Sequence, residues 1–459
     1  MKKISLTFLV LFILFGVYSL SQDSENKFTK FLKDKTHWQI KKILKDTIFY
    51  IPVQVREFKK TKNANIVLLE KNFLLEKNND ILNNKLNYGT IDIKEINNKY
   101  KIKKIIPPFY DDTNIHKNIK SGFLEIYKGK IVVAFTKGKI IYLDQNFSEG
   151  EKFTKIDSNL DTENYFDEKI NWAGIKDLKI KDDIIYISIT REVENNCYSP
   201  AILYAKIDLN YLDFKYLFKV NECVSTDRKI KAFAYFNGYQ TGGRMVDLDN
   251  SLYLSVGDYN SWELPQKDES IFGKILEINL STNKYKIISK GHRNHQGLSL
   301  YSLSKKLLIS SEHGPKGGDE VNIITIDESI DKNNYGWPMS SYGNHYDVVP
   351  LNGFTNKFAP LHKSHTKYGY KEPSIYFKKS IAPSEIIKNF FSEKNQFFLT
   401  TLKSKTIFVI EFNKEKLNAE VVDEIFIGER IRDIVFNPKK NTYYLYLEGT
   451  PYIAELSRQ

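Results

Sequence analysis

The sequence predicts an all-β fold, namely a six-bladed β-propeller that follows a partly helical N-terminal extension. Three observations point to this fold class. A strand–turn–strand unit recurs about six times, the second strand of each unit is crowded with β-branched and aromatic residues, and distinctive polar residues follow equivalent strands. Hydrophobic residues make up 41% of the 459 residues, which supplies a large core and excludes a mostly disordered chain.

The repeated unit is an apolar strand, a turn of charged, Asn or Gly residues, and a second strand of strong β-forming character. Its copies, spaced by roughly 45 to 90 residues, are GFLEIYKGKIVVAF (122–135), LKIKDDIIYISIT (178–190), RMVDLDNSLYLSVGD (244–258), LSLYSLSKKLLISSEHG (298–314), NFFSEKNQFFLTTLK (389–403) and RDIVFNPKKNTYYLYLEG (432–449). A sandwich or barrel would also contain alternating strands, but repetition of one unit favours propeller blades. If each second strand lines the central channel, Asp258, His313 and Lys403 converge on one mouth of it.

The N-terminal part differs from the rest. A short basic start precedes the apolar run 4–20, and small residues permit signal-peptide cleavage before Gln22. The run is also nearly long enough to cross a bilayer, so residues 1–22 are either a signal peptide or an uncleaved membrane anchor. Residues 23–112 are expected to form a Lys/Asn-rich extension with a helix near Asn63–Leu86, and the propeller is expected over 113–459. In either case the protein is expected to be periplasmic or otherwise extracytoplasmic.

The basic charge does not predict nucleic-acid binding. The chain carries 68 Lys+Arg against 56 Asp+Glu, a formal net charge of +12, but only eight of the basic residues are arginine and the lysines are spread along the whole chain. A solvated basic surface is therefore expected. Four of the eight arginines, Arg244, Arg293, Arg430 and Arg432, lie in the motif regions, where they predict multidentate contacts; ordinary salt bridges in loops are the alternative.

The two cysteines, Cys197 and Cys223, leave two possibilities. In an exported protein they can form one disulfide, since both lie at loop ends of a predicted antiparallel strand pair. Two independent buried thiols are the alternative. Metal ligation by cysteine is excluded by their number.

Four stretches carry most of the distinctive residues: Gly-Gly-Arg244 with Gly257-Asp258; Gly291-His-Arg-Asn-His-Gln-Gly297; Glu312-His-Gly-Pro-Lys-Gly-Gly-Asp-Glu320 with Asn334-Tyr-Gly-Trp-Pro338; and Arg430-Ile-Arg432-Asp433. Their order and content resemble the soluble glucose/sorbosone dehydrogenase family, over about residues 120–458. The resemblance implies a six-bladed propeller whose axial pocket holds pyrroloquinoline quinone (PQQ) and a calcium ion, and oxidation of an aldose or related alcohol with electrons passed to an unknown periplasmic acceptor.

The resemblance also implies roles for individual residues. Gly314 and Pro315 match the positions whose carbonyl oxygens hold calcium, and Asp319 and Glu320 look like the acids that fix this loop; capping a tight Gly-rich turn is an alternative role for both. The residues that match the family's contacts to the quinone are Arg293, Asn294, His313, Lys403, Arg430 and Arg432. His313 could equally be a structural hydrogen-bonding residue, and His292 and His295 are expected to be loop residues.

The position of the family's general base holds a different residue. The base is a histidine four residues before the arginine of Gly-Gly-Arg, and this chain has Gln240 there, with Asp258 at the position of the base's partner and Arg293 also in the catalytic group. Glutamine is not a base at neutral pH, and general-base help is typically worth about 10²–10⁴-fold. A direct role of Asp258 is one hypothesis. A non-catalytic ligand-binding propeller is the alternative function, and a calcium-dependent hydrolase such as a lactonase is a second rival.

Overall fold

The computed structural model describes residues 90–96, 99–106, 121–161, 174–226, 236, 238–413 and 417–459. The chain divides into two compact units, residues 1–86 and 87–459, and every described residue belongs to the second. The expected signal peptide or anchor and the predicted helix near 63–86 lie outside the described residues. Within the described ranges no helix has the length and apolar character that a membrane span requires.

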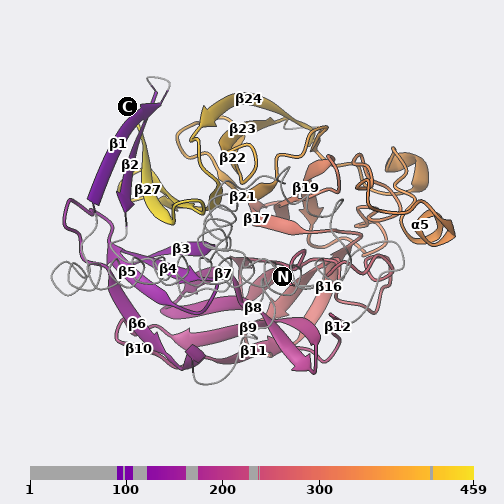
Figure 1. Ribbon diagram of the computed structural model, residues 1–459, viewed down its shortest axis with the longest axis horizontal. Coiled ribbons are helices and arrows are strands. Elements are labelled where there is room, and N and C mark those ends of the chain that lie inside the picture. Colours follow the sequence, from indigo (N-terminus) through magenta and orange to yellow (C-terminus); the bar gives the residue numbers. More distant parts are fainter. Residues whose placement is uncertain are drawn as a thin grey trace, which may run out of the picture. The chain divides into compact units, whose positions relative to one another are not determined.

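Six antiparallel sheets form the blades of the predicted six-bladed propeller, and each of the six repeated units falls in its own blade (Figure 1). From the axis outward, blade 1 contains β3 (Gly122–Tyr127), β4 (Lys130–Phe135), β5 (Ile140–Asp144) and β6 (Thr154–Ser158), and blade 2 contains β7 (Gly174–Lys181), β8 (Ile184–Glu194), β9 (Cys197–Lys206) and β11 (Lys215–Lys219). Blade 3 contains β13 (Gly242–Leu248), β14 (Ser251–Val256), β15 (Lys274–Asn279) and β16 (Tyr285–Lys290). Two short strands, β10 (Tyr211–Leu212) and β12 (Val224–Ser225), pair with β6 and β9, and a 3-10 turn η1 (Asn159–Asp161) follows β6.

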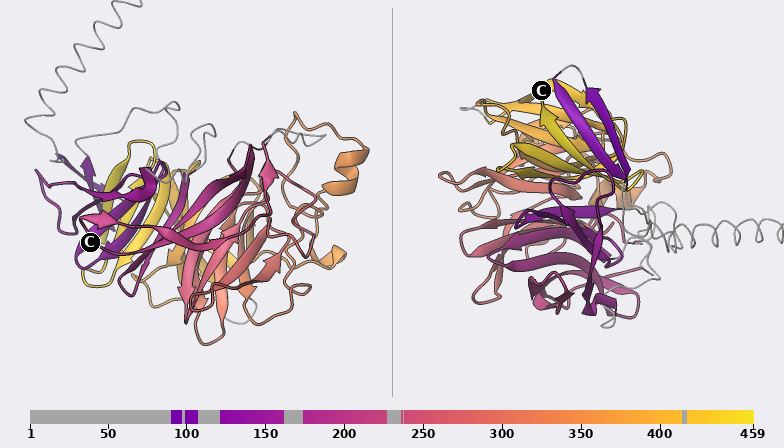
Figure 2. Two further views of the ribbon diagram at one scale, coloured as in Figure 1. Left: turned by 90° about the horizontal axis from the view of Figure 1, so that it is seen from below. Right: turned by 90° about the vertical axis from the view of Figure 1, so that its left-hand side faces the viewer.

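Blades 4 to 6 continue the same order. Blade 4 contains β17 (His295–Ser302), β18 (Leu307–Glu312), β19 (Asp319–Thr325) and β20 (Ile375–Phe377). Blade 5 contains β21 (Pro383–Lys388), β22 (Gln396–Thr401), β23 (Thr406–Phe412) and β24 (Ala419–Phe426), and blade 6 contains β25 (Ile431–Asn437), β26 (Thr442–Leu447) and β27 (Tyr452–Arg458). Between β19 and β20 a long insertion carries α5 (Gly353–Phe358) and the 3-10 turn η2 (Thr366–Tyr368), and α5 projects at the edge of the propeller (Figure 2).

Blade 6 is completed by residues from the other end of the described chain. The strand β2 (Tyr100–Ile106) pairs antiparallel with β27, from Tyr100 opposite Arg458 to Ile105 opposite Ile453, and β1 (Thr90–Ile96) pairs with β2 (Figure 1). Ile105 is fully buried in this blade. The expected propeller start at residue 113 is therefore too late, because the sequence of 90–106 looks like its Lys-rich surroundings until its pairing partner is known.

The first strand of each unit, not the second, lies at the propeller axis. The inner strands β3, β7, β13, β17, β21 and β25 contact one another in a closed ring. The second strands are next outward, and β14, β18, β22 and β26 are buried at every residue, as their composition predicts. The polar residues after the second strands nevertheless lie at the axial end where the inner strands begin, because each second strand runs back toward that end.

A buried ionic cluster fills the axis between the inner strands. Arg244 on β13 contacts Asp177 on β7 at 2.8 Å, Asp433 on β25 at 2.9 Å and Glu385 on β21 at 3.2 Å. Its Nη2 and Nε also donate to the carbonyl oxygens of Arg432 and Gln296. Arg244 thus ties five blades together, and its predicted multidentate contacts are made to protein carboxylates and carbonyl oxygens.

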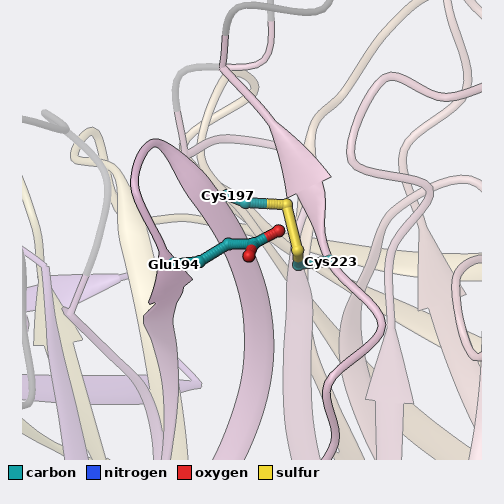
Figure 3. Close-up of side chains that lie close together, drawn as sticks. All are labelled: Glu194, Cys197 and Cys223. Atoms are coloured by element: carbon teal, nitrogen blue, oxygen red, sulfur yellow. A yellow bond between two sulfur atoms is a disulfide. The ribbon is translucent and has the colours of Figure 1, made fainter.

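The two cysteines form a disulfide in blade 2. Cys197 begins β9, Cys223 directly precedes β12, and the two Cα atoms are 5.4 Å apart (Figure 3). Pairing of β12 with β9, with Ser225 opposite Cys197, brings the two ends together. The alternative of two free thiols is excluded.

Candidate functional site

A cavity of about 570 Å³ lies at the end of the propeller where the inner strands begin. All six blades contribute to its wall, which includes Phe123, Lys176, Gly242, Asn294, Ala382 and Arg432. Ten of the twelve residues predicted from the sequence line it: Gln240, Arg293, Asn294, His313, Gly314, Pro315, Asp319, Lys403, Arg430 and Arg432. The other two, Asp258 and Glu320, do not. The sequence pattern thus predicted residues that the fold brings together around one cavity.

The wall of the cavity is strongly cationic. Among the described residues that line it, six carry basic side chains, namely Lys176, Arg293, Lys316, Lys403, Arg430 and Arg432. Asp319 is the single carboxylate in the same set. A concave surface with this imbalance concentrates a positive field and favours an anionic ligand.

Asp319 holds the loop that follows β18. Its Oδ1 accepts from the backbone N–H of Gly314 at 2.9 Å, and its Oδ2 accepts from Ile381 N–H at 2.7 Å and Ala382 N–H at 2.8 Å. This agrees with its predicted role as the acid that fixes the loop. A side chain at Gly314 would lie 2.2 Å from the carbonyl oxygen of Gly318, so the turn closes only around glycine. The carboxylate therefore joins the turn after β18 to the segment before β21.

Glu320 faces away from this loop. Its Oε1 lies 3.5 Å from His365 Nε2, and its Oε2 accepts from Asn322 Nδ2 at 3.4 Å. The expectation that Glu320 shares the loop-fixing role of Asp319 is therefore wrong. The alternation of a β-strand explains the difference, because neighbouring residues on β19 point to opposite faces.

The two carbonyl oxygens expected to bind calcium already accept hydrogen bonds. The oxygen of Gly314 accepts from Arg293 Nη1 at 2.8 Å, and that of Pro315 accepts from Tyr346 Oη at 3.2 Å. Carbonyl oxygens are ligands that calcium prefers, but two of them supply fewer than the six to eight oxygens it needs. The donor set fits calcium only if a bound ligand and water complete the shell.

Arg430 and Arg432 share one carboxylate. Arg430 Nη2 lies 2.8 Å from Glu448 Oε2, and Arg432 Nε donates to Glu448 Oε1 at 2.8 Å. Burial raises the pKa of Glu448, but the charges of the two arginines lower it. The lowering prevails, so the pKa of Glu448 lies below its ordinary value. Arg432 also donates to Gln296 Oε1 at 2.8 Å. The pair with its shared acid thus keeps one net positive charge at the cavity wall.

Two other predicted residues differ in how firmly they are held. His313 Nε2 lies 2.7 Å from the carbonyl oxygen of Pro383, and burial lowers the pKa of this histidine to about 4, so it is neutral at physiological pH. Lys403, by contrast, has no side-chain hydrogen bond or ion pair to any residue that the structure describes. Its ammonium group is therefore available to a ligand.

The residue at the base position, Gln240, adopts a left-handed backbone conformation with φ of 59°. Its carbonyl oxygen accepts from Tyr259 N–H at 3.1 Å, and a side chain at Gly257 would lie 2.1 Å from that oxygen. The side chain of Gln240 makes no hydrogen bond within the described part of the chain. Gly257 thus allows the turn that presents Gln240 to the cavity.

Asp258 lies behind the wall. It is fully buried, its Oδ2 accepts from Trp337 Nε1 at 2.8 Å, and its Oδ1 accepts from Asn260 N–H at 2.9 Å. Burial raises the pKa of Asp258 to about 6, although Arg293 opposes the shift. With its oxygens held by these two donors and its side chain off the cavity wall, Asp258 is not placed to take a proton from a ligand directly.

Lys176 is the cavity residue that sequence reasoning missed. It lies near the start of β7, and its Nζ donates to the carbonyl oxygen of Gly238 at 3.4 Å, two residues before Gln240. A side chain at Gly243 would lie 2.3 Å from Lys176 Cβ, so the Gly-Gly pair makes room for this lysine. Burial, followed by the charges of Arg432 and Lys137, lowers the pKa of Lys176 to about 7. The sequence shows only a lysine near the start of a predicted strand. That this strand lies at the axis, with the lysine facing the cavity, became known only from the structure.

The fold and the cavity together define a six-bladed propeller with a cationic cavity at its axis. Residues 123–451 match the glucose/sorbosone dehydrogenase family, so the chain belongs to this family of oxidoreductases. One relative, the aldose sugar dehydrogenase YliI of Escherichia coli, is 27% identical over 316 residues, which cover 62% of this chain and 78% of the relative.

Solved structures share the fold. The apo-form of the soluble aldose sugar dehydrogenase from Escherichia coli superposes with a TM-score of 0.59 at 20% identity, covering 81% of this chain and 100% of the other. The PQQ-bound aldose sugar dehydrogenase from Streptomyces coelicolor gives a TM-score of 0.54 at 17% identity, covering 81% and 98%. At these identities the likeness concerns the architecture.

Proposed function

We propose that the cavity binds PQQ and that the protein oxidises an aldose or related alcohol with it. The observation that carries this proposal is the charge of the wall, six basic side chains against one carboxylate that is already held by three backbone N–H groups. PQQ bears three carboxylates, and the structurally similar aldose sugar dehydrogenase of Streptomyces coelicolor has been solved with PQQ bound. When bound, it supplies a quinone that accepts a hydride equivalent from the substrate.

Particular side chains suit the carboxylates of this cofactor. Lys403 offers a free ammonium group, and Arg430, whose side chain is 42% exposed, has unused donors beside its pair with Glu448. Arg432 is held more completely, by Glu448 and Gln296, and is suited to positioning its neighbours. Arg293 and Asn294 complete the polar wall on the side of the Gly314 turn.

We propose that calcium joins this site through the carbonyl oxygens of Gly314 and Pro315. Calcium at Gly314 would compete with the guanidinium of Arg293 for the same acceptor, because Arg293 Nη1 donates to that oxygen at 2.8 Å. Two carbonyl oxygens are fewer than the six to eight that calcium needs, so further oxygen ligands would complete its coordination.

The proton of the substrate hydroxyl needs an acceptor, and Lys176 is the group we propose for it. Gln240 is not basic, and Asp258 is held behind the wall by Trp337 and Asn260. With a pKa of about 7, half of Lys176 is uncharged at neutral pH, which is the range in which a general base works best. In that role the Lys176 amine would take the hydroxyl proton of the substrate, and the bound quinone would supply the acceptor for the hydride equivalent that leaves carbon as the alcohol becomes a carbonyl.

The alternative is a binding propeller without turnover, and Gln240 at the base position is the observation that favours it. A lactonase-type hydrolase is less well supported. It would need free carboxylates around a metal, and Asp319, the one carboxylate among the described cavity residues, has its oxygens occupied by backbone donors.

An extracytoplasmic location remains part of the proposal. The apolar run 4–20 supports export, and the disulfide between Cys197 and Cys223 fits an oxidising compartment. The electron acceptor would be a component of that compartment.

The deciding experiment uses the full chain, reconstituted with PQQ and calcium, and records the absorption spectrum of the bound quinone before and after a panel of aldoses. Reduction that depends on sugar supports the dehydrogenase. Tight PQQ binding without reduction by any sugar or alcohol supports the binding propeller. Absence of PQQ binding at micromolar concentration would reject both.

A further inference from the structure

Three buried side chains gather behind the cavity wall, on the far side of Arg293. His292 lies just before β17, His295 is its first residue, and Glu312 is the last residue of β18. The two strands pair with His295 directly opposite Glu312, which places their side chains together. Both histidines are fully buried and Glu312 is 4% exposed. None of the three lines the large cavity.

The spacing of these groups suits a metal ion better than hydrogen bonds. His292 Nδ1 and His295 Nε2 lie 3.7 and 3.4 Å from the same oxygen, Glu312 Oε2, and the three residues each offer one ligand atom within 4.8 Å of the other two. Direct hydrogen bonds have separations of about 2.7–3.2 Å. A tetrahedral ion with bonds of about 2.0–2.2 Å holds its ligand atoms about 3.4 Å apart.

Three of the four histidine nitrogens also lack a hydrogen-bond partner among the described residues. His292 Nδ1 and both ring nitrogens of His295 are buried without a hydrogen bond to any described residue. A buried polar atom without a partner is rare in folded proteins, and an ion is one of its standard explanations.

The surroundings orient the first of these rings and the carboxylate. His292 Nε2 lies 2.8 Å from Ser289 Oγ, which leaves Nδ1 to face Glu312. Glu312 Oε1 accepts from Asn322 Nδ2 at 3.2 Å, and its Oε2 accepts from the backbone N–H of Arg293 at 3.1 Å. Metal-binding histidines commonly have their second nitrogen fixed in this way, although His295 Nδ1 has no such partner among the described residues.

We propose that His292, His295 and Glu312 form a buried site for one divalent transition-metal ion of the Zn²⁺ type, with a fourth position open to water. Two imidazoles and a carboxylate form a donor set typical of zinc. The ion would join the segment before β17 to the end of β18 and thereby hold the backbone of Arg293. The proposal is independent of PQQ, because it concerns atoms behind the cavity.

The test uses the full chain, purified without metal-affinity steps, stripped with a chelator and titrated with Zn²⁺ or with Co²⁺ as a spectroscopic probe. We expect one ion per chain by elemental analysis and the strong visible absorption of tetrahedral cobalt. His295→Gln should lower the affinity for the ion at least tenfold, whereas His362→Gln, a histidine outside the cluster, should leave it unchanged. Less than one ion per chain, or equal affinity in both variants, would overturn the proposal.

If His295→Gln fails to fold, a second measurement on the unaltered chain still tests the site. Crystals of the unaltered chain soaked in Zn²⁺ should give an anomalous scattering peak between the three side chains. A peak only elsewhere, or none, refutes the site. Addition of Zn²⁺ without PQQ should also raise the melting temperature of the unaltered chain but not of a folded Glu312→Gln variant, and an equal rise in both would contradict the assignment.

Discussion

Arg293 donates through Nη1 to the carbonyl oxygen of Gly314 at 2.8 Å and to that of His313 at 3.0 Å. This pair links two parts of the candidate site that the sequence treats as separate, a predicted cofactor-binding arginine and a predicted calcium-binding turn. If calcium binds to Gly314 as proposed, it would compete with the guanidinium for the same oxygen. Calcium binding and loss of this Arg293 hydrogen bond would then be coupled.

Arg293→Met tests this coupling. Without the guanidinium, calcium meets no competitor at Gly314, so its affinity in the absence of PQQ should rise. The affinity for PQQ should fall by about 10–100-fold, since charged hydrogen bonds contribute about 1.5–3 kcal/mol. Titration calorimetry measures both. The control is Lys316→Met, which alters a wall lysine paired outward with Asp347. A lower calcium affinity in Arg293→Met would contradict the competition.

Lys176→Met tests the proposed base. The rate of sugar-dependent quinone reduction should fall by about 10²–10⁴-fold, because general-base help is lost. In the unaltered protein this rate should rise with pH through about 7, as the Lys176 amine loses its proton, and the variant should lose that dependence. Stopped-flow absorption measures both at saturating PQQ.

Two further variants separate catalysis from charge. Lys403→Met also removes a cation from the wall, but it should weaken PQQ binding and leave the pH profile intact. Gln240→His in the Lys176→Met background should restore part of the rate, because it returns an imidazole to the wall. An unchanged rate and pH profile in Lys176→Met would remove Lys176 from the mechanism.

Arg244→Met should destabilise the propeller strongly. The substitution leaves Asp177, Glu385 and Asp433 buried around an apolar side chain, and breaking a buried ion pair by removing one partner costs about 3–5 kcal/mol. Denaturant unfolding measures the loss. Lys286→Met, which removes an exposed partner of Glu277, should cost about 1 kcal/mol or less. Similar losses in both variants would be inconsistent with the role of Arg244 at the axis.

The same cluster predicts a dependence of stability on pH. Burial raises the pKa of Glu385 to about 8, even though Arg244 opposes the shift. The folded state therefore binds a proton that the unfolded state has released, and stability should fall as the pH rises from about 4.5 to about 8. Glu385→Gln should reduce the slope by up to about 1.4 kcal/mol per pH unit in that interval. A slope unchanged by this substitution would show that Glu385 is ionised throughout.

The disulfide in blade 2 should stabilise the fold by lowering the conformational entropy of the unfolded chain. Cys197 and Cys223 are separated by 26 residues, and loop-closure entropy for such a loop corresponds to about 3 kcal/mol. Cys197→Ser/Cys223→Ser should lose about that free energy of unfolding. Reductant should destabilise the unaltered protein by a similar amount and have no effect on the double variant; an effect on the double variant would reveal another cause.

The sequence by itself determined the blades and which residues gather at one end of the axis. Repetition of one strand–turn–strand unit identified the six blades, because strands buried on both faces need runs such as LYLSV and YYLYL. Residues such as Arg293, Gly314 and Lys403 were correctly assigned to one cavity, since equivalent loops of a propeller meet at the same axial end.

Tertiary structure decided what depends on partners distant in the chain. Residues 90–106 became part of blade 6 only through pairing of β2 with β27. The side on which a polar residue acts was also hidden: Asp258 faces Trp337, Arg244 faces three carboxylates, and Lys176 faces the cavity. The local sequence shows which strand carries a charged residue. The pKa of that residue and the groups that it contacts depend on burial and on neighbours from all six blades, which only the tertiary structure provides.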